Sequence, residues 1–163
     1  MATVDNLKAA VAGESQANRK YSAFAQKAEE EGYTAAAKMF RAASEAEAIH
    51  ALSELKALGA VKTTAENLKA AIEGETYEFT SMYPSFIKEA EEEGNNAAKR
   101  TFHFANEAEK VHADLYRKLL DGLESKPDVE YYLCTVCGNI VENGAPDKCQ
   151  LCGSPAKAFK NIG

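Results

Sequence analysis

The sequence predicts a mainly α-helical protein, in which a four-helix bundle over residues 1–125 is followed by a small cysteine-rich domain over residues 126–163. Two observations predict this division. The first part is rich in Ala, Glu, Lys and Leu, and its apolar residues recur at spacings of three and four, which is helical periodicity. The second part holds three of the four prolines and every cysteine, and it is too small to fold on apolar burial alone without a staple.

Four long helices fit the first part, near residues 4–30, 34–58, 64–92 and 95–121. Glycines at 32, 59 and 94 mark helix ends, and the run TTAE at 63–66 is typical of a capping box that opens the third helix. The links at 31–33 and 93–95 are short, so the helices of each pair are expected to be antiparallel neighbours. The link near 59–63 fits either adjacent antiparallel helices or a diagonal crossing.

Composition excludes several classes of function. The 163-residue chain is 45% hydrophobic and 27% charged, with a net charge of −6 and no basic cluster, so nucleic acid is not an expected partner. The first residues, MATVDNLKAAVAGE, show neither the basic region nor the apolar run of a signal peptide or a membrane span. We therefore expect a cytoplasmic protein. All cysteines lie between 134 and 152, and in a reducing compartment this clustering indicates metal ligation rather than disulfides.

An internal repeat doubles the helical pair. Residues 3–14 and 64–75 read TVDNLKAAVAGE and TAENLKAAIEGE, and they are identical at eight of twelve positions. The matched pairs are Glu14 with Glu75 at an offset of 61, and then Tyr21 with Tyr83, Glu47 with Glu109, and His50 with His112 at an offset of 62. The chain is therefore a doubled helical hairpin, which predicts a bundle with pseudo-twofold symmetry.

The residues that survive the duplication predict a site for two metal ions. The Glu-x-x-His motifs at 47–50 and 109–112 place both side chains on one helix face, and Glu14 and Glu75 lie on the preceding helix of each pair. One such motif alone is usually part of a solvated face. Two copies in register, each paired with a Gly-Glu, instead favour the di-iron or di-manganese carboxylate site of helix bundles, in which the cations neutralise carboxylates that are costly to bury.

The repeat is broken at one place. Tyr21 lies seven positions after Glu14, but Tyr83 lies eight positions after Glu75, and a π-bulge in the third helix would absorb the insertion. Glu78 is an extra carboxylate in the same window, and we hypothesise that it is a seventh ligand that makes the two metals inequivalent. Tyr21 and Tyr83 fit either plain core aromatics or hydrogen-bond donors to a metal-bound carboxylate, and we favour the second role.

The cysteines form two knuckles, CTVCG at 134–138 and CQLCG at 149–153, with eleven residues between Cys137 and Cys149. Thiolates at this spacing predict a tetrahedral site, whose ligands are Cys134, Cys137, Cys149 and Cys152. The spacing alone admits zinc or iron, and on this ground a zinc ribbon that only stabilises the fold is at least as good an interpretation as a redox iron site. A neighbouring redox site for two metals favours iron, because zinc has no redox chemistry to offer.

Several motifs, in this order, resemble the rubrerythrin family over essentially the whole chain. They are GESQANRKYSAFA at 13–25, EAIH at 47–50, GETYEFTSMYPSF at 74–86, EKVH at 109–112 and YYLCTVCGNIVENGAPDKCQLCG at 131–153. One departure is Gln150, where the family usually has proline. Glutamine restores a backbone N–H near a sulfur, which is expected to shift the potential of the site without abolishing metal binding.

The resemblance implies a ferritin-like bundle with an oxo-bridged di-iron site and a rubredoxin-like domain with one iron held by the four cysteines, for which zinc is a possible substitute. It implies roles for the site residues: Glu14 and Glu75 as terminal ligands, Glu47 and Glu109 as bridges, His112 as a permanent ligand, His50 and Glu78 as alternative ligands of the other iron, and Tyr21 and Tyr83 as hydrogen-bonding tyrosines.

The activity implied by the resemblance is a peroxidase of oxidative stress defence, which reduces hydrogen peroxide to water. Electrons are expected to pass through the cysteine-bound iron from an external reductase or rubredoxin, and ultimately from NAD(P)H. A domain this small at the end of the fourth helix is expected to lie too far from the di-iron site of its own chain, so a head-to-tail homodimer or a higher oligomer is expected. The alternatives are a ferroxidase or iron-handling protein, and a non-catalytic scaffold with a zinc ribbon.

Overall fold

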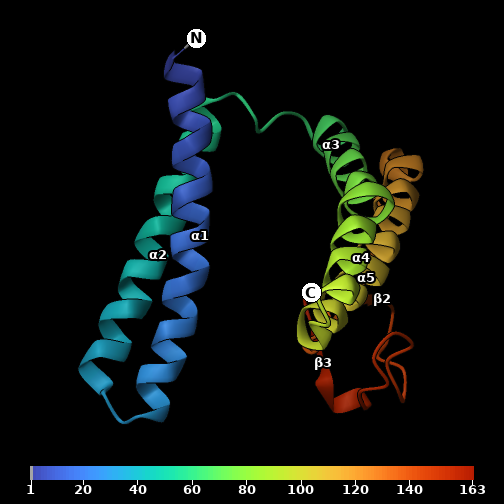
Figure 1. The fold of residues 1–163 in the computed structure, drawn as a ribbon. Coiled ribbons are helices and arrows are strands. Elements are labelled where there is room, and N and C mark those ends of the chain that lie inside the picture. Colours follow the sequence, from blue (N-terminus) through green and yellow to red (C-terminus); the bar gives the residue numbers. More distant parts are fainter. Residues whose placement is uncertain (1) are drawn as a thin grey trace. The chain divides into compact units, whose positions relative to one another are not determined.

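The computed structural model describes residues 2–163 and divides between Lys62 and Thr63 into two compact units. The first unit is a helical hairpin, in which α1 (Ala2–Glu30) and α2 (Thr34–Ala57) run antiparallel and side by side (Figure 1). Both helices confirm the sequence prediction to within two residues at each end. The turn between them passes through Gly32 in a left-handed conformation with φ +81°, which glycine adopts without steric cost.

Small side chains let the two helices of this hairpin approach closely. The buried residues are Ala25, Ala28, Ala37, Ser44 and Ala51. A polar network crosses the same contact, because the Asn18 side-chain amide donates to the carbonyl oxygen of Ser44 at 2.6 Å and to its hydroxyl at 3.0 Å. An aromatic cluster of Tyr21, Phe24 and Phe40 packs further along, with ring centroids 5.6–6.3 Å apart.

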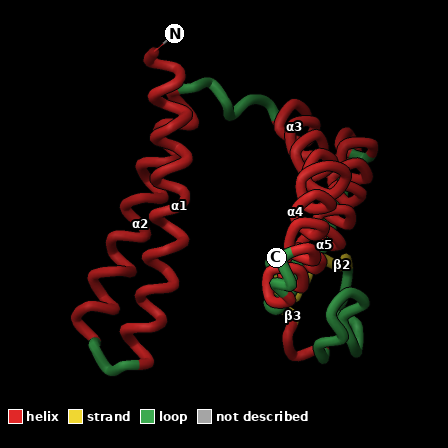
Figure 2. The backbone as a smooth tube through the Cα atoms, in the orientation of Figure 1, coloured by secondary structure: helices red, strands yellow, loops and turns green. Residues whose placement is uncertain are grey.

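The second unit begins with one long helix that changes its winding part-way. The segments α3 (Thr64–Tyr77), η1 (Glu78–Met82) and α4 (Tyr83–Glu92) follow one another without a break, and α5 (Asn96–Asp121) packs against all three. Figure 2 shows the helical character of this unit and the loops that dominate its C-terminal part. The predicted capping box is confirmed, since the Thr63 hydroxyl accepts from the Glu66 N–H and the Glu66 carboxylate accepts from the Thr63 N–H.

The η1 segment is a π-helix, which confirms the winding predicted from the one-residue insertion. The Tyr83 N–H donates to the Glu78 carbonyl five residues earlier, as in a π turn. Pro84 follows at the start of α4 and has no N–H to donate to the preceding turn. The regular series of α-helical backbone hydrogen bonds is therefore interrupted next to Pro84, where one N–H donor is missing in any case. The aromatic cluster of the first unit recurs beside it, built from Tyr83, Phe86 and Phe102.

The cysteine-rich part of the second unit is a small antiparallel sheet with two knuckles. Its strands are β1 (Tyr131–Cys134), β2 (Ile140–Glu142) and β3 (Phe159–Asn161), in the order β2-β1-β3, and the short 3-10 helix η3 (Ala156–Ala158) leads into β3. After α5 a 3-10 turn, η2 (Leu123–Ser125), ends at Lys126 in a left-handed conformation. The chain there turns back, and β2 contacts α5.

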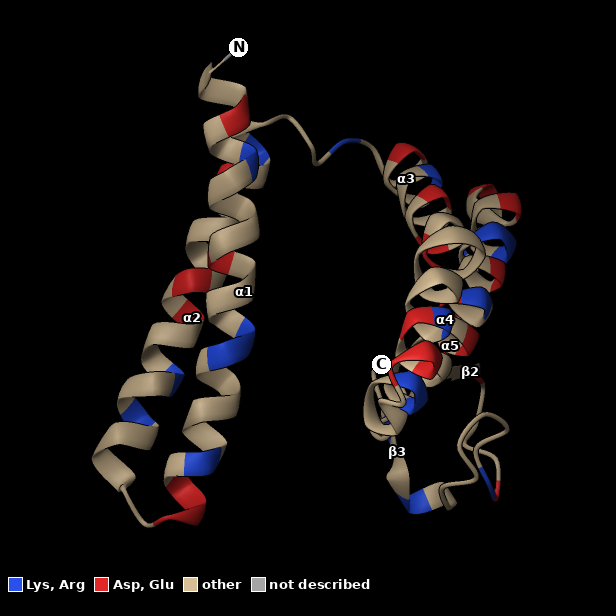
Figure 3. Cartoon of the chain, viewed as in Figure 1, with Lys and Arg blue, Asp and Glu red and all other residues tan. Residues whose placement is uncertain are grey.

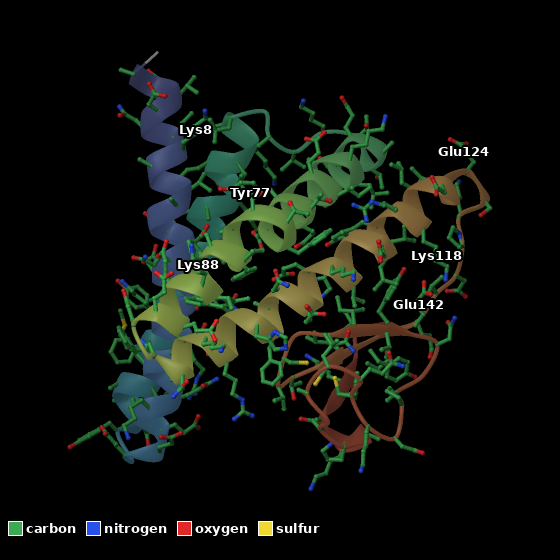
Figure 4. All side chains as sticks on the ribbon, turned by 45° about the vertical axis from the view of Figure 1, so that its right-hand side comes forward. Lys8, Tyr77, Lys88, Lys118, Glu124 and Glu142 are labelled. Carbon is green, nitrogen blue, oxygen red and sulfur yellow. The ribbon has the colours of Figure 1, made fainter. Side chains whose placement is uncertain are left out.

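An ion pair holds the sheet against α5. Lys118 of α5 and Glu142 of β2 bind one another, and Figure 4 shows both side chains between the helix and the sheet. Acidic and basic residues are interspersed along the helices of both units, as Figure 3 shows. Accordingly, none of the helices within residues 2–163 combines the length and the apolar character that crossing a membrane requires.

Candidate metal centres

The first unit gathers three of the predicted ligands at one place. Glu14 comes from α1, and Glu47 and His50 come from α2; one ligand atom from each lies within 4.8 Å of the others. The i, i+3 spacing brings the His50 Nδ1 atom to 2.8 Å from the Glu47 carboxylate. The two side chains differ in exposure, since His50 is 57% exposed and Glu47 is 19% exposed.

Carboxylates crowd together in this cluster. The hydrogen bond with Glu47, burial, and the negative charges of Glu47 and Glu54 raise the pKa of Glu14 above its usual value, and the charge of His50 opposes them. Glu54 stands one turn of α2 after His50, and its Oε2 atom is buried with no hydrogen-bond partner among residues 2–163. The repeat did not point to Glu54, because its counterpart in the second hairpin is Tyr116.

The second unit gathers the matching three residues. Glu75 of α3 and Glu109 and His112 of α5 also place ligand atoms within 4.8 Å of one another. The His112 Nδ1 atom lies 2.7 Å from a Glu109 oxygen and 4.0 Å from a Glu75 oxygen. Burial first, and then the hydrogen bond and charge of Glu109, raise the pKa of Glu75 from 4.5 to about 6. These carboxylates repel one another, and a bound divalent cation would relieve that repulsion.

Two further predicted residues face this second cluster. Glu78 opens the π-helix, and its pKa is raised by burial and by the charge of Glu75, while His112 opposes the shift. Tyr83 closes the same π turn, and its pKa is raised by burial and by the charges of Glu78, Glu109 and Glu75. Its phenol therefore keeps its proton and is available as a hydrogen-bond donor. Tyr21, its counterpart in the first unit, contacts Phe24 and Phe40.

The His112 ring connects this cluster to the cysteine-rich domain. Its Nε2 atom lies 2.8 Å from the carbonyl oxygen of Gly138, in the first knuckle. If Nε2 carries the proton and donates it to that carbonyl, Nδ1 keeps a lone pair directed toward Glu75 and Glu109, as a metal ligand requires. The ring is held, with 16% of the side chain exposed. By contrast, Glu47 is the only hydrogen-bond partner of the His50 ring among the described residues.

This contact corrects one expectation. The cysteine-rich domain was expected to lie too far from the ligands of its own chain, but here its Gly138 carbonyl contacts His112 of the same chain. The physical reason is the turn at 123–126, which reverses the chain and lays the sheet along α5. Nothing in the residue pattern indicated this reversal, because Lys126 is not a residue type that signals a left-handed turn.

The four cysteines converge as predicted. Cys134, Cys137, Cys149 and Cys152 place their sulfur atoms within 4.8 Å of one another. The Cys134 and Cys152 sulfurs are 3.7 Å apart, and those of Cys137 and Cys149 are 3.6 Å apart. Such spacings suit four thiolates around one metal ion, and the donor set fits zinc or iron.

Hydrogen-bond donors surround these sulfurs. Burial raises the pKa of the Cys152 thiol, but hydrogen bonds from the Ser154 hydroxyl and N–H, together with those from Cys137 and Cys149, lower it overall to about 6. Burial also raises the pKa of the Cys137 thiol, which the backbone N–H of Asn139 partly offsets. The buried Asn139 side chain donates to the Cys149 sulfur at 3.7 Å. Asn139 and Ser154 were not predicted from the sequence; their polar character directly after each Cys-x-x-Cys-Gly run was the available signal.

Comparison with known proteins places the chain. The family model described as rubrerythrin matches residues 5–120, and that described as the rubrerythrin rubredoxin-like domain matches residues 132–160. The chain belongs to the rubrerythrin family. Among curated members, nigerythrin of Nitratidesulfovibrio vulgaris is 37% identical over 96% of this chain and 85% of its own length. Rubrerythrin-2 of Clostridium acetobutylicum is 33% identical over 97% and 95%.

Solved structures agree with this membership. The partially reduced state of nigerythrin matches with a TM-score of 0.61 at 37% identity, covering 98% of this rubrerythrin-family chain and 86% of that one. The fully reduced, all-ferrous state of nigerythrin matches with the same TM-score at 36% identity. The fold class is thereby confirmed as mainly α-helical with a small rubredoxin-like sheet domain. Within residues 2–163, the structure brings together two carboxylate and histidine clusters and one four-cysteine cluster.

Proposed function

We propose that this protein is a non-haem di-iron peroxidase that reduces hydrogen peroxide to water, with electrons relayed through an iron in the four-cysteine site. The observation that carries the proposal is the 2.8 Å contact between His112 Nε2 and the Gly138 carbonyl. It joins a ligand of the carboxylate cluster to the residue that follows Cys137. A protein that only stores iron has no use for a thiolate site hydrogen-bonded to its ligand set.

The proposal takes the two carboxylate clusters as halves of one dimetal centre. The repeat supports it, because each unit supplies a Glu from one helix and a Glu-x-x-His from the next. The proposed ligands are Glu14, Glu47, His50, Glu75, Glu78, Glu109 and His112. Iron is supported by the relative whose fully reduced state is described as all ferrous. Iron held by these residues would supply, in its ferrous state, the two electrons that cleavage of the peroxide O–O bond consumes.

The surroundings of the two histidines support different roles for them. His112 is held through its Nε2 atom, which lies 2.8 Å from the Gly138 carbonyl oxygen, and its side chain is only 16% exposed, so it suits a permanent ligand. His50 is 57% exposed and is held only by Glu47 among the described residues, so its ring is free to approach or leave a cation. Glu78 opens a π-helix, a winding that is frequent at functional sites, and this supports the alternating role proposed for it with His50.

The protein's own groups also supply a polar environment for the substrate. Reduction of hydrogen peroxide to two molecules of water consumes two protons as well as two electrons. Tyr83 faces Glu75, Glu78 and Glu109 with its phenol protonated. It therefore supplies a hydrogen-bond donor beside the ligands, either to a ligand carboxylate or to an oxygen of the substrate.

The deciding experiment is anaerobic stopped-flow absorption. The iron-loaded protein is reduced and mixed with one equivalent of hydrogen peroxide, and the visible absorption of the cysteine-bound ferric iron is followed. Rapid return of that absorption is expected in the wild type and in Glu45→Ala, which removes an exposed carboxylate from the same helix as Glu47. Loss of the return in Glu47→Ala completes the expected pattern. If peroxide is consumed while the cysteine-bound iron stays reduced, the two sites are uncoupled and a ferroxidase is the better assignment.

A further inference from the structure

Asn139 occupies an unusual place in the cysteine-rich domain. Its side chain is 3% exposed, and its amide nitrogen lies 3.7 Å from the Cys149 sulfur. Its backbone carbonyl accepts a hydrogen bond from the Cys134 N–H at 2.8 Å, and its backbone N–H donates a hydrogen bond to the Cys137 sulfur. This one residue therefore contacts both cysteines of the first knuckle through its backbone and one cysteine of the second knuckle through its side chain.

A second side chain donates to a different sulfur. The Ser154 hydroxyl lies 3.2 Å from the Cys152 sulfur. A metal-bound cysteine has lost its proton, so the hydroxyl must be the donor in that state. The knuckle geometry places backbone N–H groups near the sulfurs, and almost any residue at those positions would supply them. The donors from Asn139 and Ser154 depend on side-chain identity, so they distinguish this domain from a bare Cys-x-x-Cys framework.

Such donors act on the redox equilibrium through charge. Four thiolates around ferric iron carry a net charge of −1, and around ferrous iron a net charge of −2. A hydrogen bond to sulfur stabilises the more negative state more strongly, and the effect grows where water is excluded. Cys134 and Cys149 are buried at 0% and 3% exposure, so part of this cluster is poorly solvated and depends on protein donors.

We propose that the Asn139 side chain, aided by the Ser154 hydroxyl, raises the reduction potential of the four-cysteine site and biases it toward the ferrous state. The electron is then held beside Gly138, whose carbonyl contacts His112. The inference rests on the proposed function only in assigning iron to the four-cysteine site. It does not require that peroxide be the substrate.

The test is spectroelectrochemical titration of the iron-loaded full-length protein, followed through the ferric thiolate absorption. Asn139→Leu removes the donor at similar volume, and Ser154→Ala removes the hydroxyl. Each is expected to lower the equilibrium constant for one-electron reduction by about tenfold, which is about 59 mV. Thr135→Val is the matched control, because the Thr135 hydroxyl donates to the Ala158 carbonyl at 2.9 Å instead of a sulfur. Its midpoint potential should equal that of the wild type.

Unchanged or higher potentials in both Asn139→Leu and Ser154→Ala overturn the inference. If Asn139→Leu fails to fold and shows no ferric thiolate absorption, Asn139→Ser and the Ser154→Ala measurement decide the matter. The outcome is also separable from that of the proposed function. If the variants have lowered potentials but the wild type does not react with peroxide, the donor role is supported and the peroxidase is refuted. If the variants have unaltered potentials and the wild type is a competent peroxidase, the donor role is refuted and the peroxidase is supported.

Discussion

Glu75→Gln is expected to stabilise the metal-free protein at neutral pH, although it removes a proposed ligand. The pKa of Glu75 is raised from 4.5 to about 6, mainly by burial and then by the hydrogen bond and charge of Glu109. A raised pKa means that the ionised carboxylate is less favourable in the folded chain than in the unfolded chain. Glutamine keeps the shape of the side chain and removes the charge.

The size of the effect follows from the same pKa. The difference between 4.5 and about 6 corresponds to about 2 kcal/mol at about 1.36 kcal/mol per pH unit. The Glu75 side chain remains 21% exposed, so solvent screens part of this, and we expect about 1 kcal/mol. Since the folded-state pKa is raised, the penalty is absent below pH 4.5, grows as the pH rises through about 6 and is then constant.

Urea unfolding of the chelator-treated protein, followed by circular dichroism at pH 4.5 and pH 7, measures this difference. Glu73→Gln is the matched control, because Glu73 is an exposed carboxylate on the same helix. The stability advantage of Glu75→Gln should appear at pH 7 and fade at pH 4.5. Added Mn²⁺ should reverse the order, since the metal binds the ionised carboxylate of the wild type. A metal-free Glu75→Gln that is less stable than the wild type at pH 7 would refute the reasoning.

Three further substitutions test the scaffold by thermal or urea unfolding. Asn18→Ala removes both donors to Ser44 and should cost about 1–3 kcal/mol, because buried acceptors lose their partner; an unchanged midpoint would mean that water replaces the amide. Thr63→Ala abolishes the capping box with Glu66 and should cost about 1 kcal/mol; a neutral result would show that this end is frayed. Gly94→Ala forces a side chain into φ +70° and should cost about 1 kcal/mol, so a stabilised variant would contradict the turn geometry.

The features that could be predicted are those with a local cause. Apolar spacing and terminal glycines located the helices to within a few residues, and the offset change between Glu75 and Tyr83 located the π-helix. The ligands that gather in the two carboxylate clusters were predicted from the internal repeat together with the Glu-x-x-His spacing, and the four-cysteine cluster was predicted from the spacing of its two knuckles. The union of the carboxylate clusters into a single dimetal centre, and the domain boundary at residue 125, remain predictions.

The features that were missed depend on contacts between segments far apart in the sequence. The reversal at Lys126 leaves no signature in residue type, so the approach of Gly138 to His112 was not foreseen. Asn139 was missed for a related reason. An asparagine after a knuckle is ordinarily a turn residue, and its role as a sulfur donor emerges only when the second knuckle is folded against it.

The contact between His112 and Gly138 lies within one chain, and the end of α5 together with the residues that follow it connects the two groups. Their effective concentration is therefore set by a short tether and not by the amount of protein in solution. Dilution leaves such a contact intact, whereas a contact between two separate molecules weakens in proportion. An exchange of electrons across this contact would be first order in protein, and its rate constant would not depend on the concentration of the protein.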